Sequence, residues 1–339
     1  MKRTVNRVGI LVATAALSLG LVACSGNEAG TEANGASTSA TAAAEVHKFE
    51  NCGHSMEIDG VPQKVMLVNR VGVVPTLEAL GVLDHVHMVA GPFPGEYFSP
   101  ELAKKVAAIP LLTDKVDAGG HLQISKEEIV ATDSDLIIGY AGNVDYNAMQ
   151  GTGVPIIEEP GFCGALNGAA SWDHVWDHIK FYGDLFDASE AAEKFTAETK
   201  ARLEAAEAKK AGEGLRVAVL YPATDGSVNY AYGAGSMSNP IVESAGMINV
   251  FGDSADRVFE VSDEELIARN PDVIISLHSK GGDEAAAASI EGVKQIKGIN
   301  DTNAGKNGAI MPMLLYLAEP PSGMSIDGLE QLNEFLEQR

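Results

Sequence analysis

Two matching stretches decide the fold: Ile124–Ile138 (ISKEEIVATDSDLII) and Val261–Ile275 (VSDEELIARNPDVII). In each stretch a serine stands three residues before a glutamate and opens an apolar periodic run, which is the capping-box pattern of a helix start. An aspartate and a short apolar run rich in β-branched residues follow, as expected of a strand buried on both faces. Each copy therefore predicts a helix that leads into a strand of a parallel sheet, and the repetition predicts two similar α/β lobes.

Each copy also carries one glutamate that helix capping leaves unexplained. The predicted box of the first copy pairs Ser125 with Glu128, and the second copy repeats the pair at the matching positions. Glu127 and Glu264 remain as a matched pair of acids, one on each lobe. An acid in the first helical turn can simply complement the helix macrodipole, which is worth about 0.5 kcal/mol. A shared function of the two acids is the alternative.

The beginning of the chain has the pattern of an export signal over residues 1–23. Basic residues precede an apolar run from Val8 to Leu21, which is too short for a lasting membrane span. The run ends in Leu-Val-Ala before Cys24, which resembles the lipobox of bacterial lipoproteins. We expect Cys24 to be lipidated and to anchor the exported protein at the outer face of the cell membrane. A plain signal peptide followed by a chance cysteine is the alternative.

The rest of the chain divides into a linker, two lobes and a connecting helix. Residues 24–46 are small and polar, which predicts a flexible linker. A run without Gly or Pro, rich in Ala, Glu and Lys, predicts a long helix within 188–212. This helix separates a first lobe at 47–187 from a second lobe at 213–339, and as a rigid connection it should limit hinge motion. Within the first lobe, residues 109–123 are expected to form a loop.

Charge and cysteine content narrow the possible environments and partners. The chain has 47 acidic and 24 basic residues and a net charge of −23, which argues against nucleic acid as a partner. Cys52 and Cys163 are the cysteines left after Cys24, and an exported domain is normally oxidised. We therefore expect a Cys52–Cys163 disulfide. Metal ligation by Cys52 with His54 is the alternative, although these two residues alone make a sparse site.

Five segments carry a likeness to a known family: Pro62–Val68, Leu77–Asp84, Ser125–Ile138, Asn239–Asn249 and Val261–Ser276. With them the chain, from about Phe49 to Leu336, resembles the Fe/B12 periplasmic-binding family, the substrate-binding lipoproteins of ABC importers for ferric siderophores, haem and cobalamin. In one departure from the family pattern, Asp133-Ser134 stands where Lys-Pro is usual.

The resemblance implies both a fold and a partner. The fold would be two Rossmann-like α/β lobes joined by a single long helix, the helical-backbone class III of substrate-binding proteins. The chain would act as a monomer that delivers a small-molecule ligand to an ABC permease dimer with its ATPase subunits. In relatives, one glutamate per lobe meets arginines of the two permease subunits. Glu127 and Glu264 occupy the matching positions, so the resemblance implies a docking role for them, and charge-assisted pairs would fix the orientation.

The candidate ligand residues come from loops that follow the predicted strands, because ligands of open parallel sheets collect beyond the carboxyl ends of strands. These residues are mainly aromatic with few charges, which suits a large planar or macrocyclic ligand. A highly anionic tris-catecholate complex would need more basic residues. The transported ligand is expected to be a ferric siderophore, haem or a cobalamin-like corrinoid, with no catalytic cofactor. The candidates are Asn69, Arg70, Phe93, Tyr97, Tyr140, Asn143, Tyr230, Tyr232, Arg257, His278 and Tyr316.

Other functions stay open at this point. If the ligand is haem, Tyr140, Tyr230, Tyr232 or His278 could supply the iron ligand. His174 and His178 lie four residues apart on a predicted helix, a spacing that can hold Zn²⁺, so a zinc- or manganese-binding lipoprotein is an alternative. Their neighbours follow an apolar stripe typical of a core helix, so no metal ligand is assigned. A hydrolase is a remote alternative, since the sequence lacks a Gly-x-Ser-x-Gly motif, and we expect no enzymatic activity.

Overall fold

The repeated helix-to-strand unit is present in both lobes. The computed structural model describes residues 46–116, 122–166, 168–223 and 228–339. In the first lobe, α3 (Lys126–Val130) leads into β6 (Leu136–Gly139), and in the second lobe α9 (Asp263–Arg269) leads into β12 (Val273–His278). Both strands are almost completely buried, and each pairs in parallel with a strand on either side. The predicted units are therefore confirmed.

The sheet of the first lobe is parallel throughout. Its five strands lie in the order β5-β4-β3-β6-β7. The strands not yet given are β3 (Val65–Val68), β4 (Val86–Ala90), β5 (Leu111–Thr113) and β7 (Ile156–Ile157). The prediction that 109–123 is a loop was wrong at β5, where three residues pair with the edge of β4. The helical segments of this lobe are η1 (Val71–Val73), α1 (Val74–Ala79), η2 (Leu83–His85), η3 (Gly95–Tyr97), α2 (Pro100–Ala107), α4 (Tyr146–Met149), α5 (Pro160–Cys163) and α6 (Trp172–Leu185).

The sheet of the second lobe is mixed. Its main order is β11-β9-β8-β12-β13, and β10 pairs with β8. β9 runs antiparallel to both β8 and β11, so two antiparallel pairings extend a parallel core. These strands are β8 (Arg216–Tyr221), β9 (Asn229–Tyr232), β10 (Ile248–Asn249), β11 (Val258–Val261) and β13 (Ile310–Leu314). The remaining helical segments are α8 (Ser238–Ser244), α10 (Asp283–Gln295), η4 (Ile299–Asp301), α11 (Asn303–Asn307), α12 (Leu315–Ala318) and α13 (Met324–Glu337).

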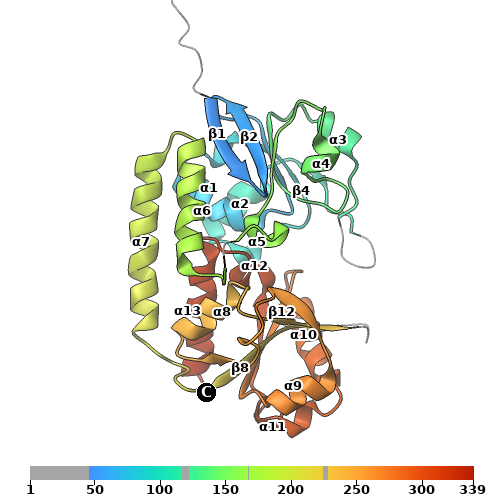
Figure 1. Ribbon diagram of the computed structural model, residues 1–339, viewed down its shortest axis with the longest axis vertical. Coiled ribbons are helices and arrows are strands. Elements are labelled where there is room, and N and C mark those ends of the chain that lie inside the picture. Colours follow the sequence, from blue (N-terminus) through green and yellow to red (C-terminus); the bar gives the residue numbers. More distant parts are fainter. Residues whose placement is uncertain (1–45, 117–121, 167, 224–227) are drawn as a thin grey trace, which may run out of the picture. The chain divides into compact units, whose positions relative to one another are not determined.

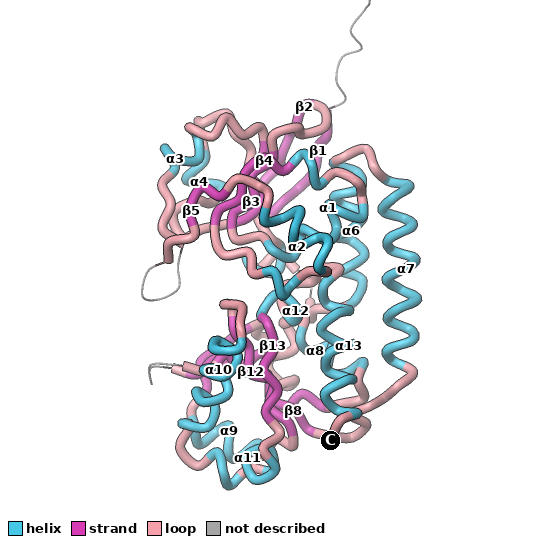
Figure 2. Tube along the Cα trace, turned by 180° about the vertical axis from the view of Figure 1, so that it is seen from behind, coloured by secondary structure: helices cyan, strands magenta, loops and turns pink. Residues whose placement is uncertain are grey.

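The long helix α7 (Ser189–Glu207) runs beside both lobes (Figure 1). It falls within the range predicted for the connecting helix, and the fold class of two α/β lobes joined by one long helix is confirmed. Figure 2 shows α13 alongside α7. Arg202 of α7 reaches Asp327 and Glu330 of α13, each at 2.6 Å, and the Asn333 amide donates to the carbonyl of Ala206 at 3.0 Å. The connecting helix is therefore fixed along the side of the second lobe.

A second junction joins α6, α7 and α8. The indole Nε1 of Trp172 donates to Ser244 Oγ at 2.9 Å, and Ser244 donates to Glu207 Oε1 at 2.7 Å. Trp172 belongs to α6 beside the first lobe, whereas Ser244 belongs to the second lobe. One hydroxyl thus connects the two lobes and the end of the long helix.

The aspartate of each repeated unit fastens the start of the neighbouring strand. The Asp135 carboxylate accepts the backbone N–H groups of Gln63 at 2.7 Å and Lys64 at 3.0 Å, just before β3. Asp272 accepts the N–H of Arg216 at 2.9 Å, at the first residue of β8. Because both aspartates precede the repeated strand, they align it with its neighbour in the same way in each lobe.

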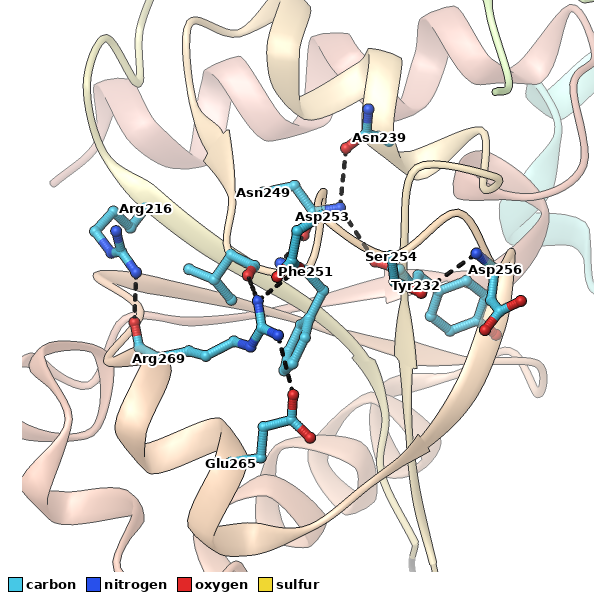
Figure 3. Close-up of polar contacts among 11 residues, drawn as sticks. Arg216, Tyr232, Asn239, Asn249, Phe251, Asp253, Ser254, Asp256, Glu265 and Arg269 are labelled. Atoms are coloured by element: carbon cyan, nitrogen blue, oxygen red, sulfur yellow. Dashed lines mark hydrogen bonds and ion pairs between the residues drawn. The ribbon is translucent and has the colours of Figure 1, made fainter. Parts of the chain in front are cut away.

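The helix caps differ between the two copies. Ser125 accepts the N–H of Glu128 at 3.2 Å, and the Glu128 carboxylate accepts the N–H of Ser125 at 2.8 Å, which confirms the first capping box. Ser262 also caps its helix, but the carboxylate of Glu265 turns away and pairs with Arg269 at 3.0 Å (Figure 3). The second box was therefore wrong in its reciprocal half, because a guanidinium one turn along the helix attracts the carboxylate more strongly than a backbone N–H.

The first lobe begins with a hairpin that a disulfide attaches to α5. The hairpin pairs β1 (Val46–Asn51) with β2 (His54–Asp59) in antiparallel register. Cys52 lies in the turn of this hairpin and is bonded to Cys163, which confirms the expected disulfide. Beside it, the Asn51 side chain donates to the carbonyl of Glu158 at 2.9 Å and accepts its N–H at 2.8 Å. Three bonds therefore hold the segment after β7 against the hairpin.

The predicted signal, Cys24 and nearly all of the linker lie outside the described residues. Val46, the last residue assigned to the linker, is the first residue of β1. Within the described ranges, no helix is both long enough and apolar enough to cross a membrane.

Candidate functional site

A cavity of about 750 Å³ lies where the two lobes face each other. Its wall combines the ends of β3, β6 and β7 from the first lobe with β9, the start of β11 and α12 from the second. The volume falls in the range typical of small-molecule sites. We refer to this cavity as the cleft.

Seven of the predicted ligand residues line the cleft: Asn69, Arg70, Tyr140, Tyr230, Tyr232, Arg257 and Tyr316. Asn69 follows β3, Tyr140 follows β6, and Tyr316 follows β13. These positions agree with the rule that ligands collect at the carboxyl ends of parallel strands. The aromatic pair of β9 lies on an antiparallel strand, which the rule does not cover.

The other four predicted residues, Phe93, Tyr97, Asn143 and His278, are not part of the cleft wall. Tyr97 is buried and its hydroxyl accepts the N–H of Tyr316 at 3.3 Å, so it supports a wall residue from behind. Asn143 donates to the carbonyl of Ile124 at 2.6 Å and so stabilises the loop before α3. His278 Nδ1 lies 2.8 Å from the carbonyl of Lys280.

Four residues of the segment Glu158–Cys163 line the cleft and were missed by the sequence prediction, apart from the disulfide of Cys163: Glu158, Glu159, Phe162 and Cys163. The segment directly follows β7, so the rule of strand ends, applied to this short strand as well, would have found it. Phe162 is the aromatic residue of the segment. The Arg257 guanidinium of the second lobe lies 5.1 Å from the centre of its ring, a cation–π contact across the cleft.

Three aromatic rings of the cleft wall are exposed to solvent. Tyr140, Tyr230 and Phe162 are 45%, 39% and 38% exposed, although large apolar side chains of this kind are usually covered. Such rings offer apolar area to a ligand at little cost in side-chain entropy. The cleft therefore presents a ready aromatic surface.

Both arginines of the cleft wall already have carboxylate partners. Arg70 is buried and forms an ion pair with Glu159, which is also buried. Burial lowers the pKa of Arg70 from its ordinary value. Arg257 Nη1 lies 3.5 Å from Oε2 of the buried Glu319. Burial raises the pKa of Glu319, and the guanidinium of Arg257 acts in the opposite direction.

Tyr316 connects the two lobes across the cleft. Its hydroxyl donates to the carbonyl of Asn69 at 2.6 Å, and its ring packs edge-on against Tyr97 at 5.7 Å between ring centres. Burial raises the pKa of Tyr316, so the phenol stays protonated and keeps its donor role. This bond joins the two walls of the cleft directly.

The histidine pair of α6 serves the helix and its core. Nδ1 of His174 accepts the N–H of Ser171 at 3.1 Å and so caps the start of the helix. The Nε2 atom of His178 is sealed from solvent without a hydrogen-bond partner, and burial lowers the pKa of His178 to about 3. Among the described residues, no group of three or more His, Cys, Asp or Glu side chains is arranged to hold a metal ion.

Glu127 and Glu264 occupy the same place in their two helices. Each is the second residue of its helix, α3 or α9, and each is exposed. Neither carboxylate pairs with another residue in the described part of the chain. Both helices lie on the side of the molecule away from α7 (Figure 1).

Comparison with known proteins places this architecture in a family. The model of the family described as periplasmic binding protein matches residues 72–313. The chain belongs to the periplasmic binding protein family. This binding protein is of the iron, haem and vitamin B12 type, as its resemblance predicted. Proteins of this family bind substrates, rather than acting as enzymes, and deliver them to an ABC permease.

Solved structures support the assignment. The binding protein is 37% identical to a protein of the ABC-type Fe³⁺-hydroxamate transport system of Saccharomonospora viridis, with a TM-score of 0.79 over 85% of this chain and 98% of that one. The apo periplasmic haem-binding protein of Roseiflexus sp. RS-1 is 21% identical, with a TM-score of 0.63 over 81% and 98% of the two chains. The periplasmic vitamin B12 binding protein of Vibrio cholerae is 17% identical, with a TM-score of 0.57 over 82% and 97%. The last two show the fold alone. No curated protein matches the chain.

Proposed function

We propose that this protein captures an iron complex, in the first place a ferric siderophore, in the cleft between its lobes and presents it to an ABC permease. The observation that carries the proposal is the cleft itself, a cavity of about 750 Å³ with exposed aromatic rings contributed by both lobes. A bulky iron complex can bury its organic surface against such rings. The 37% identical neighbour, which belongs to a ferric hydroxamate transport system, supports this ligand class.

Calorimetric titration of the purified protein with ferric siderophores tests this proposal. The double variant Tyr140→Ala/Tyr230→Ala removes one exposed ring from each lobe, and we expect it to weaken binding by at least about tenfold, which corresponds to about 1.4 kcal/mol. Leu111→Ala is the matched control, because Leu111 is 52% exposed and is not part of the cleft wall. Unchanged affinity in the double variant would contradict the proposed site. Native mass spectrometry of protein purified from its own host would identify a retained ligand by its mass.

Haem is the second candidate, with a cobalamin-like corrinoid as a third. Haem is favoured by the exposure of Tyr140 and Tyr230, because either phenol could reach an iron ion in the cleft. A titration with haemin would then shift the Soret band, and Tyr140→Phe or Tyr230→Phe would abolish the shift. No change in the Soret band removes this candidate. Binding of a corrinoid would not depend on either hydroxyl group, so neither variant would change it.

Glu127 and Glu264 form the docking pair for the two permease subunits. The support is their matched position, their exposure and the lack of a partner within the described residues. We expect Glu127→Ala/Glu264→Ala to abolish most ligand uptake by cells while ligand affinity in solution stays unchanged. The control Glu193→Ala/Glu213→Ala removes two exposed acids elsewhere and should not alter uptake. Normal uptake with the docking variant would refute this role.

Lipidation of Cys24 keeps the protein at the outer face of the membrane. The expected support is biochemical: mass spectrometry of the mature protein should find Cys24 at the N-terminus with acyl chains attached. We expect Cys24→Ala to release the protein from the membrane fraction or to block its processing. A mature N-terminus at another residue would favour the plain signal peptide.

A further inference from the structure

Arg70 is a cation of the cleft wall whose charge is already paired and is not available to a ligand. Its side chain is 2% exposed and that of its partner Glu159 is 5% exposed. A ligand anion that attracted Arg70 would leave the Glu159 carboxylate buried without a counter-charge. An uncompensated charge at a buried position is strongly unfavourable. Arg70 therefore contributes no free positive charge to the cleft.

Arg257 is the other cation of the wall, and Glu319 neutralises it from behind. The Arg257 side chain is 29% exposed, so its guanidinium faces the cleft, whereas Glu319 is 1% exposed. The guanidinium also packs over the ring of Phe162. Its charge is thus balanced by one buried carboxylate, and its position is fixed between that carboxylate and an aromatic ring.

Glu158 adds a negative charge to the cleft wall that no basic side chain neutralises within the described residues. It lines the cleft, and one carboxylate oxygen accepts the N–H of Tyr146 at 3.3 Å. Within the described residues no Arg or Lys side chain pairs with it, and no Lys lines the cleft. Two arginines, Arg70 and Arg257, are set beside three carboxylates, those of Glu158, Glu159 and Glu319. The net charge of these side chains is negative.

We propose that the cleft selects iron complexes by charge: it accepts neutral or cationic complexes and excludes anionic ones, with Glu319 as the residue that sets the preference. This inference rests on the proposed function. Three hydroxamate groups carry one negative charge each and together neutralise Fe³⁺, so a tris-hydroxamate complex is neutral, or cationic if it bears an amine. A tris-catecholate complex keeps three negative charges. Such a ligand would face Glu158 and meet no unpaired cation, and like charges at close range disfavour binding.

The test compares three ferric complexes by calorimetric titration: ferrioxamine B (singly positive), ferrichrome (neutral) and ferric enterobactin (triply negative). We expect the first two to bind at least about tenfold more tightly than the third. Glu319→Gln keeps the size of the side chain and frees Arg257, so it should improve binding of the anionic complex by about tenfold and weaken binding of the cationic one. Glu193→Gln, which removes an exposed acid that is not part of the cleft wall, should change neither.

Glu158→Gln provides a second variant, because Glu158 is only partly buried and its replacement does not disturb a buried pair. It should shift the preference in the same direction as Glu319→Gln. Equal affinity for all three complexes, together with no effect of either variant, would overturn charge selection and leave the proposed function intact. If none of the three complexes binds, the proposed function and the charge selection fall together.

Discussion

The two lobes share a repeated unit but hold their cleft walls by different means. The first lobe attaches its wall segment through the Cys52–Cys163 disulfide, the double hydrogen bond of Asn51, and the buried pair of Arg70 with Glu159. The second lobe extends its sheet through the antiparallel pairings of β9 with β8 and β11, and it places one partly exposed arginine at the wall. The comparison indicates a division of roles: the first lobe fixes the geometry of the cleft through a covalent bond and a buried ion pair, whereas the second lobe supplies the partly exposed arginine.

Removing the disulfide should have the largest effect on the difference in stability between the two lobes. Cys52→Ser/Cys163→Ser opens a loop of 111 residues in sequence separation, and the chain-entropy model gives a loss of about 4 to 5 kcal/mol in the free energy of unfolding. Urea denaturation of the oxidised protein and the variant measures the loss. Hydrogen exchange should show the loss of protection in the strands of the first lobe and not in those of the second. Equal loss in both lobes would contradict the proposed division.

The two ion pairs of the cleft give a matched pair of variants. Arg70→Met leaves Glu159 alone in a fully buried position, and we expect a loss of about 3 to 5 kcal/mol in stability. Arg257→Met should cost less, because this arginine is partly exposed and water can approach the space it leaves. Thermal and urea unfolding of both variants test the order. If Arg257→Met were the more destabilising, the first lobe would not be the more rigidly built wall.

The buried histidine of α6 should make the stability of the protein sensitive to acid. The pKa of His178 is about 3 in the folded protein, whereas the ordinary value for a histidine is 6.5. Below pH 6.5 His178 binds a proton in the unfolded chain but stays neutral in the folded protein. Its contribution to the free energy of unfolding is therefore complete above pH 6.5 and is lost as the pH falls toward 3. At pH 5 this amounts to about 2 kcal/mol.

The variant His178→Phe isolates this effect. It keeps a ring against Tyr182, with which His178 packs edge-on, and removes the titrating group. Urea unfolding at pH 7 and pH 5 should show a decline that is about 2 kcal/mol smaller in the variant than in the parent. An identical decline in the two proteins would exclude His178 as a cause.

The helix caps should give the smallest difference between the lobes. Glu128→Ala removes half of a reciprocal capping box, for which we expect a loss of about 1 kcal/mol. Glu265→Ala removes an ion pair with Arg269 one turn along the helix, which is worth about 0.3 to 0.5 kcal/mol. Hydrogen exchange of the first helical turn in α3 and α9 compares the two. Equal effects would mean that the reciprocal bond in α3 adds nothing.

Structure that neighbouring residues determine was predictable from the sequence, whereas structure that depends on competing or distant partners was not. The repeated units were predictable because a cap, an apolar stripe and a strand are encoded within some fifteen neighbouring residues. The pairing of Glu265 with Arg269 was not, since two local partners compete for one carboxylate and a pattern does not rank them. The mixed sheet was missed for a different reason: β9 is only four residues long, and its direction depends on β8 and β11.

Within the cleft, the limit was partnership between distant residues. The strand-end rule brought Asn69, Tyr140 and Tyr316 to one place, and it also nominated Arg70 as a ligand residue without its partner. Its neutralisation depends on Glu159, which comes much later in the chain and follows a strand of two residues. Phe162 was missed at the same strand. The composition of the site was therefore predictable in part, whereas its charge balance required the three-dimensional contacts.

The hydrogen bond between Trp172 and Ser244 gives the protein an optical reporter of its own. The chain has two tryptophans, Trp172 and Trp176, and both lie on α6 with ring centres 6.4 Å apart. The indole N–H of one of them is bonded to a hydroxyl of the other lobe. Because indole emission depends on hydrogen bonding and on contact with water, any ligand that tilts the lobes and stretches this bond should change the fluorescence spectrum. Unlabelled protein would then record its own opening and closing in real time.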